Sequence, residues 1–467
     1  MKTPTSPCFE IIQNISDLLP LHQQWQQEFP FYLQSAISDP GTYQNARYDI
    51  LFAFPQETLI LEKDGLLSGS EIHYDSNDFL SEFDHLWKVV SDKNLVNLNP
   101  DIPFMGGWFV YLGYELAGQI ESRLNLPETA EDIPIALASR IPAAIINDHL
   151  LKQTILVAES ELYLKQLKQR YLTVHPGKIK SNSIKHSEIT EEDADRYIDS
   201  VQRVKRYIID GDVFQVNLSR VWHAEITQSL VDSSQIYFNL RKTNPAPFSG
   251  IAQIGETSII SSSPERLVKV NKKIVETRPI AGTRPRSNAV KDDIKLKQEL
   301  ISHPKERAEH IMLIDLERND LGRICIPGSI EVNELMTLES YAHVHHIVSN
   351  IRGELRSEVT PGEVIRAVFP GGTITGCPKE RCMAIIAELE GEGRGAYTGS
   401  MGYVNHNGDM DFNILIRTIT KSSDNIIIRA GAGLVADSDA KHELNETRHK
   451  ARGMLLALEQ PESTDIV

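Results

Sequence analysis

Cysteine is scarce in this sequence, which has four in 467 residues: Cys8, Cys325, Cys377 and Cys382. Their spacing matches no paired-cysteine metal motif, and a chain of this length can bury a sizeable core without a disulfide framework. Four reduced thiols are typical of a cytoplasmic protein. The cysteine content therefore excludes the small disulfide-stapled class of secreted domains.

Long apolar runs and positive charge are also lacking. No run reaches the roughly 18 residues that a membrane-spanning helix needs, and residues 1–7 lead into polar sequence without the apolar core of a signal peptide. Lys and Arg number 48 against 64 Asp and Glu, a net charge of −16. This balance disfavours a nucleic-acid binder, which needs a basic surface, but allows a small anionic substrate held by local cations. We expect neither a membrane nor nucleic acid as a partner.

The composition is that of a globular protein, with 41% hydrophobic and 24% charged residues. Residues 1–178 are predicted to form a strand-rich domain, with short runs such as Tyr48–Phe54 and a hairpin over 143–158 that turns at Asn147–His149. The polar segment 175–188 is the best candidate for a linker. After a helix capped at Thr190, strands alternate with helices, and a second domain is predicted over 190–458.

A predicted helix over 438–457 is the most informative stretch. At ~100° per residue, Glu443, Glu446 and Lys450 share one side, at the edge of an apolar stripe. Two carboxylates one turn apart can hold a hard divalent cation such as Mg²⁺. The same spacing also suits an ordinary Glu446–Lys450 ion pair on a solvated face. The helix by itself leaves both interpretations open.

A glycine-rich segment, Pro370–Gly376, precedes a second predicted helix, for which Thr375 is a plausible cap. The free N–H groups of such a turn bind anions, although a tight structural turn is an equal alternative. The segment is not a P-loop, because Cys377-Pro378 separates Gly376 from Lys379 and no Ser or Thr follows the lysine. A nucleotide triphosphatase is rejected on this ground.

Several single residues have chemical potential but are weak signals alone. Arg417 ends a predicted strand and could fork onto a carboxylate or form a surface ion pair. Gly431–Gly433 follows a strand and lets the backbone approach a ligand. Taken singly, Glu265 and Glu309 would be solvated carboxylates and His346 a core histidine. No Ser/His/Asp order or Cys/His cluster for nucleophilic catalysis stands out.

Together these pieces resemble the chorismate-utilising enzyme family, which includes anthranilate, aminodeoxychorismate, isochorismate and salicylate synthases. The resemblance covers about residues 190–458 and is specific, because many long motifs occur in one order. The motifs are Ser263-Pro-Glu-Arg-Leu, Thr277-Arg-Pro-Ile-Ala-Gly-Thr-Arg-Pro-Arg, Arg307-Ala-Glu-His-Ile-Met-Leu-Ile-Asp-Leu-Glu-Arg-Asn-Asp, Val344-His-His-Ile-Val-Ser, Phe369-Pro-Gly-Gly-Thr-Ile-Thr-Gly-Cys-Pro-Lys, Arg429-Ala-Gly-Ala-Gly and Asn445-Glu-Thr-Arg-His-Lys-Ala-Arg.

The resemblance implies an α+β fold, a large mixed α/β sandwich of the anthranilate synthase component I type. It implies Mg²⁺ held by Glu309 and Glu446, with Glu443 near through water. Glu265 would be the general acid on the leaving C4 hydroxyl and His346 would sit beside the ring, with Ala281 and Thr283 also at catalytic positions. The residues implied to hold the substrate carboxylates are Thr375, Tyr397, Arg417, Gly431, Ala432, Gly433 and Lys450.

Three features bear on the branch of the family. Water-using members carry a lysine base at the position of Gln215, and glutamine cannot take a proton, so ammonia is the favoured nucleophile. Gly371–Gly376, Phe31–Ser35 and Ala46–Leu51 resemble the aminodeoxychorismate branch, which serves para-aminobenzoate and folate synthesis. Ala281 points instead to anthranilate synthase, because many aminodeoxychorismate synthases have a nucleophilic lysine there.

We expect an aminodeoxychorismate synthase component I, with anthranilate synthase component I as the alternative. No Cys/His nucleophile is evident for releasing ammonia from glutamine, so a separate glutamine amidotransferase subunit is expected as partner. A non-enzymatic binding module would explain the loops and Arg417 but not Glu265, Glu309 and Glu446 together.

Overall fold

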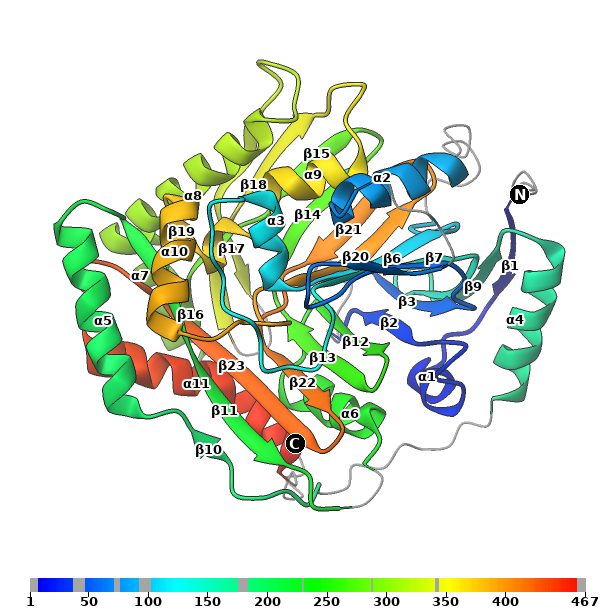
Figure 1. The fold of residues 1–467 in the computed structure, drawn as a ribbon, viewed down its shortest axis with the longest axis horizontal. Helices are drawn as coiled ribbons and strands as arrows, with labels where there is room; N and C mark the ends of the chain where they lie inside the picture. Colours follow the sequence, from blue (N-terminus) through cyan, green and yellow to red (C-terminus); the bar gives the residue numbers. More distant parts are fainter. Residues whose placement is uncertain are drawn as a thin grey trace.

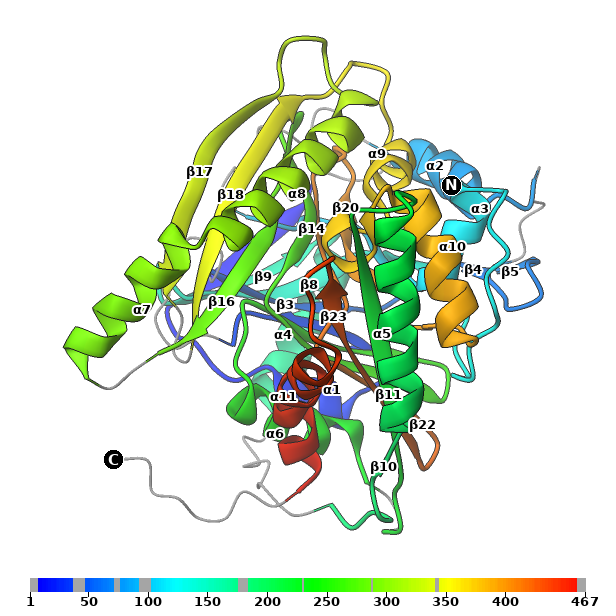
Figure 2. The same ribbon diagram turned by 90° about the vertical axis from the view of Figure 1, so that its left-hand side faces the viewer.

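Two large sheets form the centre of the protein, and every strand pair recorded within either sheet is antiparallel. The computed structural model describes residues 7–36, 47–70, 76–91, 102–174, 184–228, 231–286, 289–340 and 344–459. The sheets lie face to face, with helices on both outer faces (Figures 1 and 2). Within the described ranges, no helix is long and apolar enough to cross a membrane.

The first sheet contains twelve strands among the described residues, in the order β1 (Cys8–Ile12), β9 (Gln153–Ala158), β8 (Ala143–Asp148), β3 (Tyr48–Ala53), β2 (Phe31–Gln34), β12 (Phe248–Ile254), β13 (Thr257–Ser263), β22 (Thr418–Ser422), β23 (Asn425–Leu434), β11 (Gln215–Glu225) and β10 (Thr190–Glu191), with β19 (Gly376–Cys377) also paired to β11.

The second sheet contains eleven strands in the same part of the chain, in the order β16 (Ile280–Pro285), β18 (Val344–Glu354), β15 (Ile274–Thr277), β14 (Arg266–Asn271), β21 (Met410–Asn413), β20 (Ser400–Asn405), β6 (Gly107–Leu112), β7 (Ala136–Ile141), β4 (Thr58–Leu61) and β5 (Leu67–Gly69), with β17 (Glu331–Ser340) paired to β18.

The helices begin and end where the local sequence supplies caps and breaks. Asp439 caps α11 (Ala440–Leu458) through its side chain, and Thr360 with Glu363 forms a capping box on α9 (Pro361–Val368). Pro304 starts α8 (Pro304–Gly322) one residue after the end of α7 (Val290–Ser302). The helices are α1 (Leu19–Gln24), α2 (Phe79–Val90), α3 (Ala117–Ile120), α4 (Glu161–Thr173), α5 (Ala194–Ile209), α6 (Ser233–Thr243), α7 (Val290–Ser302), α8 (Pro304–Gly322), α9 (Pro361–Val368), α10 (Lys379–Glu390) and α11 (Ala440–Leu458), with 3₁₀ turns at Tyr114–Leu116 and Gly372–Ile374.

The core follows the alternation of strand side chains. On β13, Ile259 faces the apolar layer between the sheets, while Ile260 packs towards the helices on the outside of the first sheet. These outer helices are α1, α4, α6 and α11. Helices α2, α8 and α9 cover the second sheet in the same way. The predicted α+β sandwich is therefore confirmed.

The strands of the N-terminal part extend both sheets. Strand β2 pairs with β12 in the first sheet, and β6 pairs with β20 in the second. Each sheet therefore runs without interruption from strands near the N-terminus into strands of the rest of the chain. The division into domains at 1–178 and 190–458 stays a prediction, and residues 175–183 of the predicted linker lie outside the described residues.

Three local predictions need correction. Thr190 belongs to the short strand β10, and Asp193 caps α5. Thr375 does not cap α10, because Gly376 and Cys377 pair with β11 before that helix begins. The β8–β9 hairpin turns between Asp148 and Gln153, slightly later than expected.

Candidate active site

Two neighbouring chain crossings between the sheets position the central residues of the site. After β13, residues 264–265 lead into β14 of the second sheet; after β21, residues 414–417 lead back into β22 of the first. Hydrogen bonds tie the crossings together: Ile414 N donates to Glu265 O at 3.0 Å, and Ser262 N to Arg417 O at 3.0 Å. The predicted continuous strand through Arg417 is therefore wrong, and Arg417 has a φ of 55°.

Glu265 is buried, with 6% of its surface exposed. Burial raises the pKa of its carboxyl to about 7, although the Thr373 hydroxyl, the Ile280 amide and the charge of Lys450 act in the opposite direction. A carboxyl with this pKa keeps a proton near neutral pH. Glu265 can therefore act as a general acid.

Arg417 has no carboxylate partner among the described residues. Its guanidinium donates to Asn244 Oδ1 at 3.2 Å, and burial lowers the pKa of the group. A desolvated cation without a counter-ion is costly. An anionic ligand at this position would offset that cost, so the site is suited to a carboxylate-bearing substrate.

Gly431 and Gly433 on β23 make room for polar side chains from neighbouring elements. A Cβ atom on Gly431 would lie 2.7 Å from Asn217 Oδ1 and 2.8 Å from Tyr397 Oη, and one on Gly433 would lie 2.5 Å from Gln215 Nε2. The backbone here admits only glycine without displacing these groups. Ala432, between them, belongs instead to the apolar cluster under α5 and α10.

Lys450 on α11 contacts β23 at Gly431. Its Nζ donates to Gly431 O at 3.1 Å and pairs with Glu446 at 2.8 Å. The ordinary i,i+4 ion pair considered from the sequence is therefore present. The charge of Lys450 also lowers the pKa of Glu265, so the ammonium group that contacts β23 is close enough to act on the general acid.

The three predicted metal ligands come from two helices. Glu309 on α8 accepts a hydrogen bond from Gln215 Nε2 at 2.8 Å. Glu443 on α11 is buried. The pKa of Tyr197 is raised mainly by its own burial, and the nearby charges of Glu443 and Glu446 raise it further. No group of three or more His, Cys, Asp or Glu side chains that could hold a metal is found in the described ranges. A pair of carboxylates still suits Mg²⁺, which completes its shell with water and substrate oxygens.

His346 is a buried, neutral histidine on β18. Burial, followed by the charge of Arg417, lowers the pKa of the imidazole to about 4, and the ring bonds the backbone of Gly282. In the sheet, Ala281 is paired with Ile347 and Thr283 with His346. Ala281 is buried; the Thr283 side chain lies outside the described part of the structure.

Thr375 is fully buried, and its hydroxyl donates to Gly371 O at 2.9 Å. It therefore stabilises the glycine-rich loop from within. Three residues that sequence reasoning missed also belong to the site: Asn217, Asn244 and Thr373. Asn217 could have been found, since it lies two residues from Gln215 on the same strand and so shares its face.

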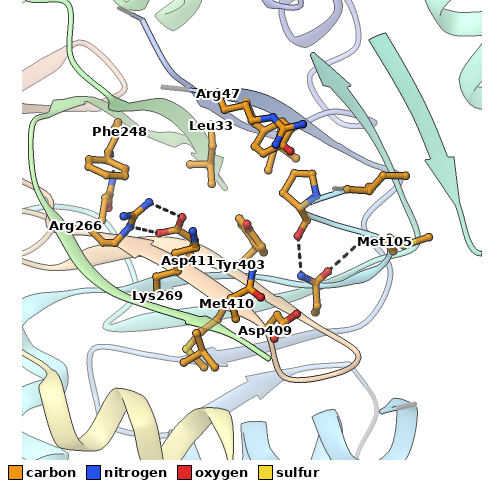
Figure 3. Close-up of a pocket in the computed structure, with 18 of the residues that line it drawn as sticks. Leu33, Arg47, Met105, Phe248, Arg266, Lys269, Tyr403, Asp409, Met410 and Asp411 are labelled. Carbon is orange, nitrogen blue, oxygen red and sulfur yellow. Dashed lines mark hydrogen bonds and ion pairs between the residues drawn. The ribbon is translucent and has the colours of Figure 1, made fainter. Parts of the chain in front are cut away.

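A cavity of about 330 Å³ lies elsewhere, between strands of both sheets (Figure 3). Arg266 lies over the Phe248 ring there, 4.8 Å from its centroid, and pairs with Asp411 at 2.8 Å. None of the predicted site residues lines this cavity.

Comparison with known proteins gives a consistent picture. The sequence model of the family described as chorismate binding enzyme matches residues 42–456, so the chain belongs to this family. An anthranilate synthase component I-like protein of Synechocystis sp. is 43% identical over 373 residues, covering 79% of this chain and 76% of its own. Aminodeoxychorismate synthase component 1 of Bacillus subtilis is 40% identical over 438 residues, covering 90% and 91%.

Solved structures agree. The crystal structure of anthranilate synthase component I from Streptococcus pneumoniae TIGR4 matches with a TM-score of 0.78 at 33% identity, covering 88% of this chain and 92% of that one. The predicted family is confirmed. The protein is a chorismate-utilising enzyme whose relatives include both kinds of synthase.

Proposed function

We propose that the protein is an aminodeoxychorismate synthase component I, which replaces the C4 hydroxyl of chorismate with an amino group from ammonia. A C–N bond forms at the ring and the C4–O bond breaks. The hydroxyl leaves as water after taking a proton from Glu265, and the Glu265 carboxylate is reprotonated by the proton that the newly bound ammonia gives up. The product is 4-amino-4-deoxychorismate, with its enolpyruvyl group retained.

The proposal depends on one observation: a buried proton donor, Glu265, and a cation without a carboxylate partner in the described ranges, Arg417, lie on adjacent chain crossings. Glu265 has a pKa of about 7. A substrate carboxylate on Arg417 would be supported by the Tyr397 hydroxyl and by Lys450, both of which lie at Gly431. In this proposal, such fixed contacts would orient the ring with its C4 hydroxyl towards Glu265.

Mg²⁺, when bound by Glu309 and Glu446 with Glu443 near, would neutralise substrate charge and stabilise the charge that develops as the hydroxyl leaves. Neutral His346 cannot compete with Glu265 as proton donor, since its pKa of about 4 leaves it unprotonated. Its ring can instead pack beside the substrate.

Gln215 supports ammonia as the nucleophile. Its side chain is 97% buried, its Nε2 is engaged by Glu309, and its Oε1 has no partner among the described residues. An amide oxygen cannot act as a base towards water, but it can accept a hydrogen bond from an N–H group of ammonia. Leaving such an acceptor unsatisfied is costly, so an incoming donor is favoured.

Anthranilate synthase component I is the second candidate, and Ala281 favours it. Alanine cannot add covalently to C2, so amination here must rely on ammonia oriented by the surrounding residues. The glycine-rich loop Gly371–Gly376 and the segment Phe31–Ser35 favour the first candidate.

The relatives are named as components 1 or I of their enzymes. We infer that this chain also works with a second component, a glutamine amidotransferase that releases ammonia. All four cysteines are free thiols in the structure, which supports work in the cytoplasm.

Incubation of the purified chain with chorismate, Mg²⁺ and ammonium chloride tests the proposal. Chromatography should show 4-amino-4-deoxychorismate, converted to para-aminobenzoate only when a lyase is added. Anthranilate formed without any lyase would overturn the proposed branch and promote the second candidate. Unchanged chorismate would favour a binding module.

A further inference from the structure

Tyr397 reaches the site from a short connection, the tyrosine loop, defined as residues 393–398 between α10 and β20. The Tyr397 hydroxyl lies 2.8 Å from the position of a Cβ atom on Gly431. Two loop residues have positive φ angles, 59° at Gly395 and 62° at Thr398. The loop is therefore tightly bent, and contacts from outside must hold it in this shape.

Two glutamates from the N-terminal part of the chain bind three consecutive amides of the tyrosine loop. Glu115 Oε1 accepts from Arg394 N at 2.7 Å and from Gly395 N at 3.2 Å. Glu131 Oε2 accepts from Ala396 N at 2.9 Å. Tyr397 follows directly, so the carboxylates fix the backbone that carries it.

The glycines of the loop allow this contact. A Cβ atom on Gly395 would overlap Glu131 Oε2, and one on Gly393 would lie 2.7 Å from Glu115 Oε1. The backbones also meet directly, since Tyr114 N donates to Gly395 O at 2.9 Å and Gly393 N to Glu128 O at 2.9 Å. Larger residues at the two glycines would push the loop off the glutamates.

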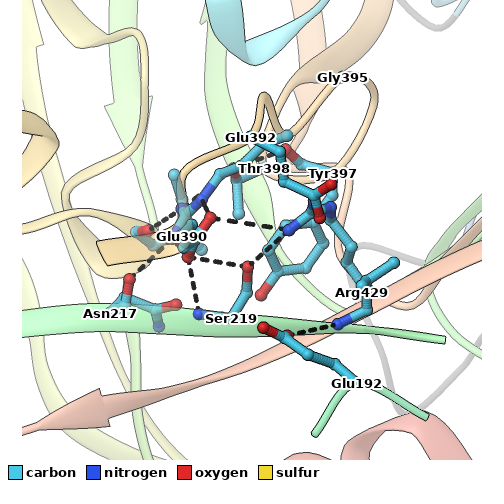
Figure 4. A network of polar contacts seen from close by, with 12 residues as sticks. Glu192, Asn217, Ser219, Glu390, Glu392, Gly395, Tyr397, Thr398 and Arg429 are labelled. Carbon is cyan, nitrogen blue, oxygen red and sulfur yellow. Dashed lines mark hydrogen bonds and ion pairs between the residues drawn. The ribbon is translucent and has the colours of Figure 1, made fainter. Parts of the chain in front are cut away.

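The opposite side of the loop is fixed by Arg394, which is 1% exposed. Its guanidinium pairs with Glu390 at 2.6 Å and donates to Asn217 O at 2.8 Å. Arg429 joins the same network through Glu390 and Glu392 (Figure 4). The tyrosine loop is thus held between the N-terminal glutamates and the strand that carries Gln215.

We propose that Glu131, assisted by Glu115, is a positioning residue that sets the place of the Tyr397 hydroxyl against the substrate. This inference rests on the proposed role of Tyr397 in binding chorismate. If it holds, residues 115–131, which are distant in sequence from the family motifs, help to shape the site directly.

Substitutions of Glu131 that keep or remove its hydrogen bond to Ala396 N distinguish a positioning role from a catalytic one. An amide oxygen accepts a hydrogen bond as a carboxyl does, so Glu131→Gln should keep the KM for chorismate. Glu131→Ala leaves the Ala396 amide without its acceptor and should raise the KM about tenfold, the typical value of one hydrogen bond. The kcat should change less, because Tyr397 holds substrate and transition state alike. Glu128→Ala, at an exposed position on the same segment, is the matched control.

The decisive experiment is a double-mutant cycle with Tyr397→Phe, measuring chorismate consumption with Mg²⁺ and ammonium chloride. If Glu131 acts through Tyr397, E131A should add little to the KM of Y397F. Additive effects, or an unchanged KM in E131A, would overturn the inference while leaving Tyr397 as a binding residue. An unchanged KM in Y397F would remove the proposed role of Tyr397 and the inference with it.

A thermal unfolding scan of each variant separates positioning from loss of fold. If E131A does not fold, Glu131→Asp takes its place, because it withdraws the carboxyl group by one methylene and keeps the same functional group. A KM raised in E131D but not in E131Q supports the inference. Equal KM values for E131D, E131Q and the wild type contradict it.

Discussion

Replacing Glu265 with glutamine should remove most of the turnover and, above neutral pH, stabilise the protein. The amide has nearly the shape of the protonated carboxyl but no proton to give. Loss of a general acid reduces kcat by about 10²- to 10⁴-fold. The stability effect has the opposite sign because the wild-type protein must keep a carboxylate buried once the pH rises.

The size of the stability effect follows from the pKa. Burial raises the pKa of Glu265 from its ordinary value of 4.5 to about 7. Because the carboxyl is held protonated in the folded protein, the stability that Glu265 contributes is fully present below pH 4.5. It is lost as the pH rises through about 7, where the buried group must ionise. At 1.36 kcal/mol per pH unit, the loss in the wild type approaches about 3 kcal/mol. E265Q carries no such loss.

Urea unfolding of the wild type and E265Q at pH 5 and pH 8 measures this difference. The gain in unfolding free energy from E265Q should be small at pH 5 and larger at pH 8 by up to about 3 kcal/mol. Circular dichroism before unfolding serves as the control for an intact fold. An equal difference at both pH values, or near-normal turnover in E265Q, would refute the protonated, buried state of Glu265.

Three further predictions concern the charges around this acid. Glu309→Gln and Glu446→Gln should each abolish turnover with an unchanged circular dichroism spectrum, because each removes an anionic Mg²⁺ ligand; near-normal rates at saturating Mg²⁺ in both would contradict the metal assignment. Arg417→Gln should lower kcat/KM about 10- to 100-fold, the value of a hydrogen bond to a charged group, without lowering the Tm, since no ion pair is lost; a lower Tm with normal kcat/KM would mark Arg417 as structural. The purified chain should use ammonium salts alone, and glutamine only after an amidotransferase subunit is added; glutamine-dependent turnover by the chain alone would exclude that partner.

Local sequence signals predicted α11, whereas α1, α2 and α6 were not predicted from the sequence. Helix α11 has an Asp cap and an apolar stripe, and its acids and Lys450 lie where the periodicity placed them. Pro304, whose ring cannot continue a helix, separates α7 from α8. A residue type suited to capping was not sufficient by itself, since neither Thr190 nor Thr375 caps the helix that follows it.

The crossing between the sheets could not be predicted in the same way. The run Phe412–Ile416 is apolar enough for one strand, and nothing in it marks the change of sheet after Asn413. The positive φ of Arg417 carries no signal, because such angles are normally inferred from glycine. Family motifs placed Arg417 in the site, but its unpaired state emerged only from the fold.

Contacts between distant segments were also invisible. The pairing of β2 with β12 and of β6 with β20 joins strands far apart in the chain, and neither strand carries a local mark of its partner. The hydrogen bonds from the tyrosine loop to Glu115 and Glu131 span more than 260 residues. Both glutamates would be solvated surface acids by their residue type alone.

The most direct test of the account is mass spectrometry of the product formed from chorismate, Mg²⁺ and ¹⁵N-labelled ammonium chloride. The proposed chemistry requires one labelled nitrogen in a product that still carries the enolpyruvyl group, with no pyruvate released. Labelled anthranilate together with pyruvate would contradict amination at C4, and an unlabelled product containing oxygen from water would contradict ammonia as the nucleophile.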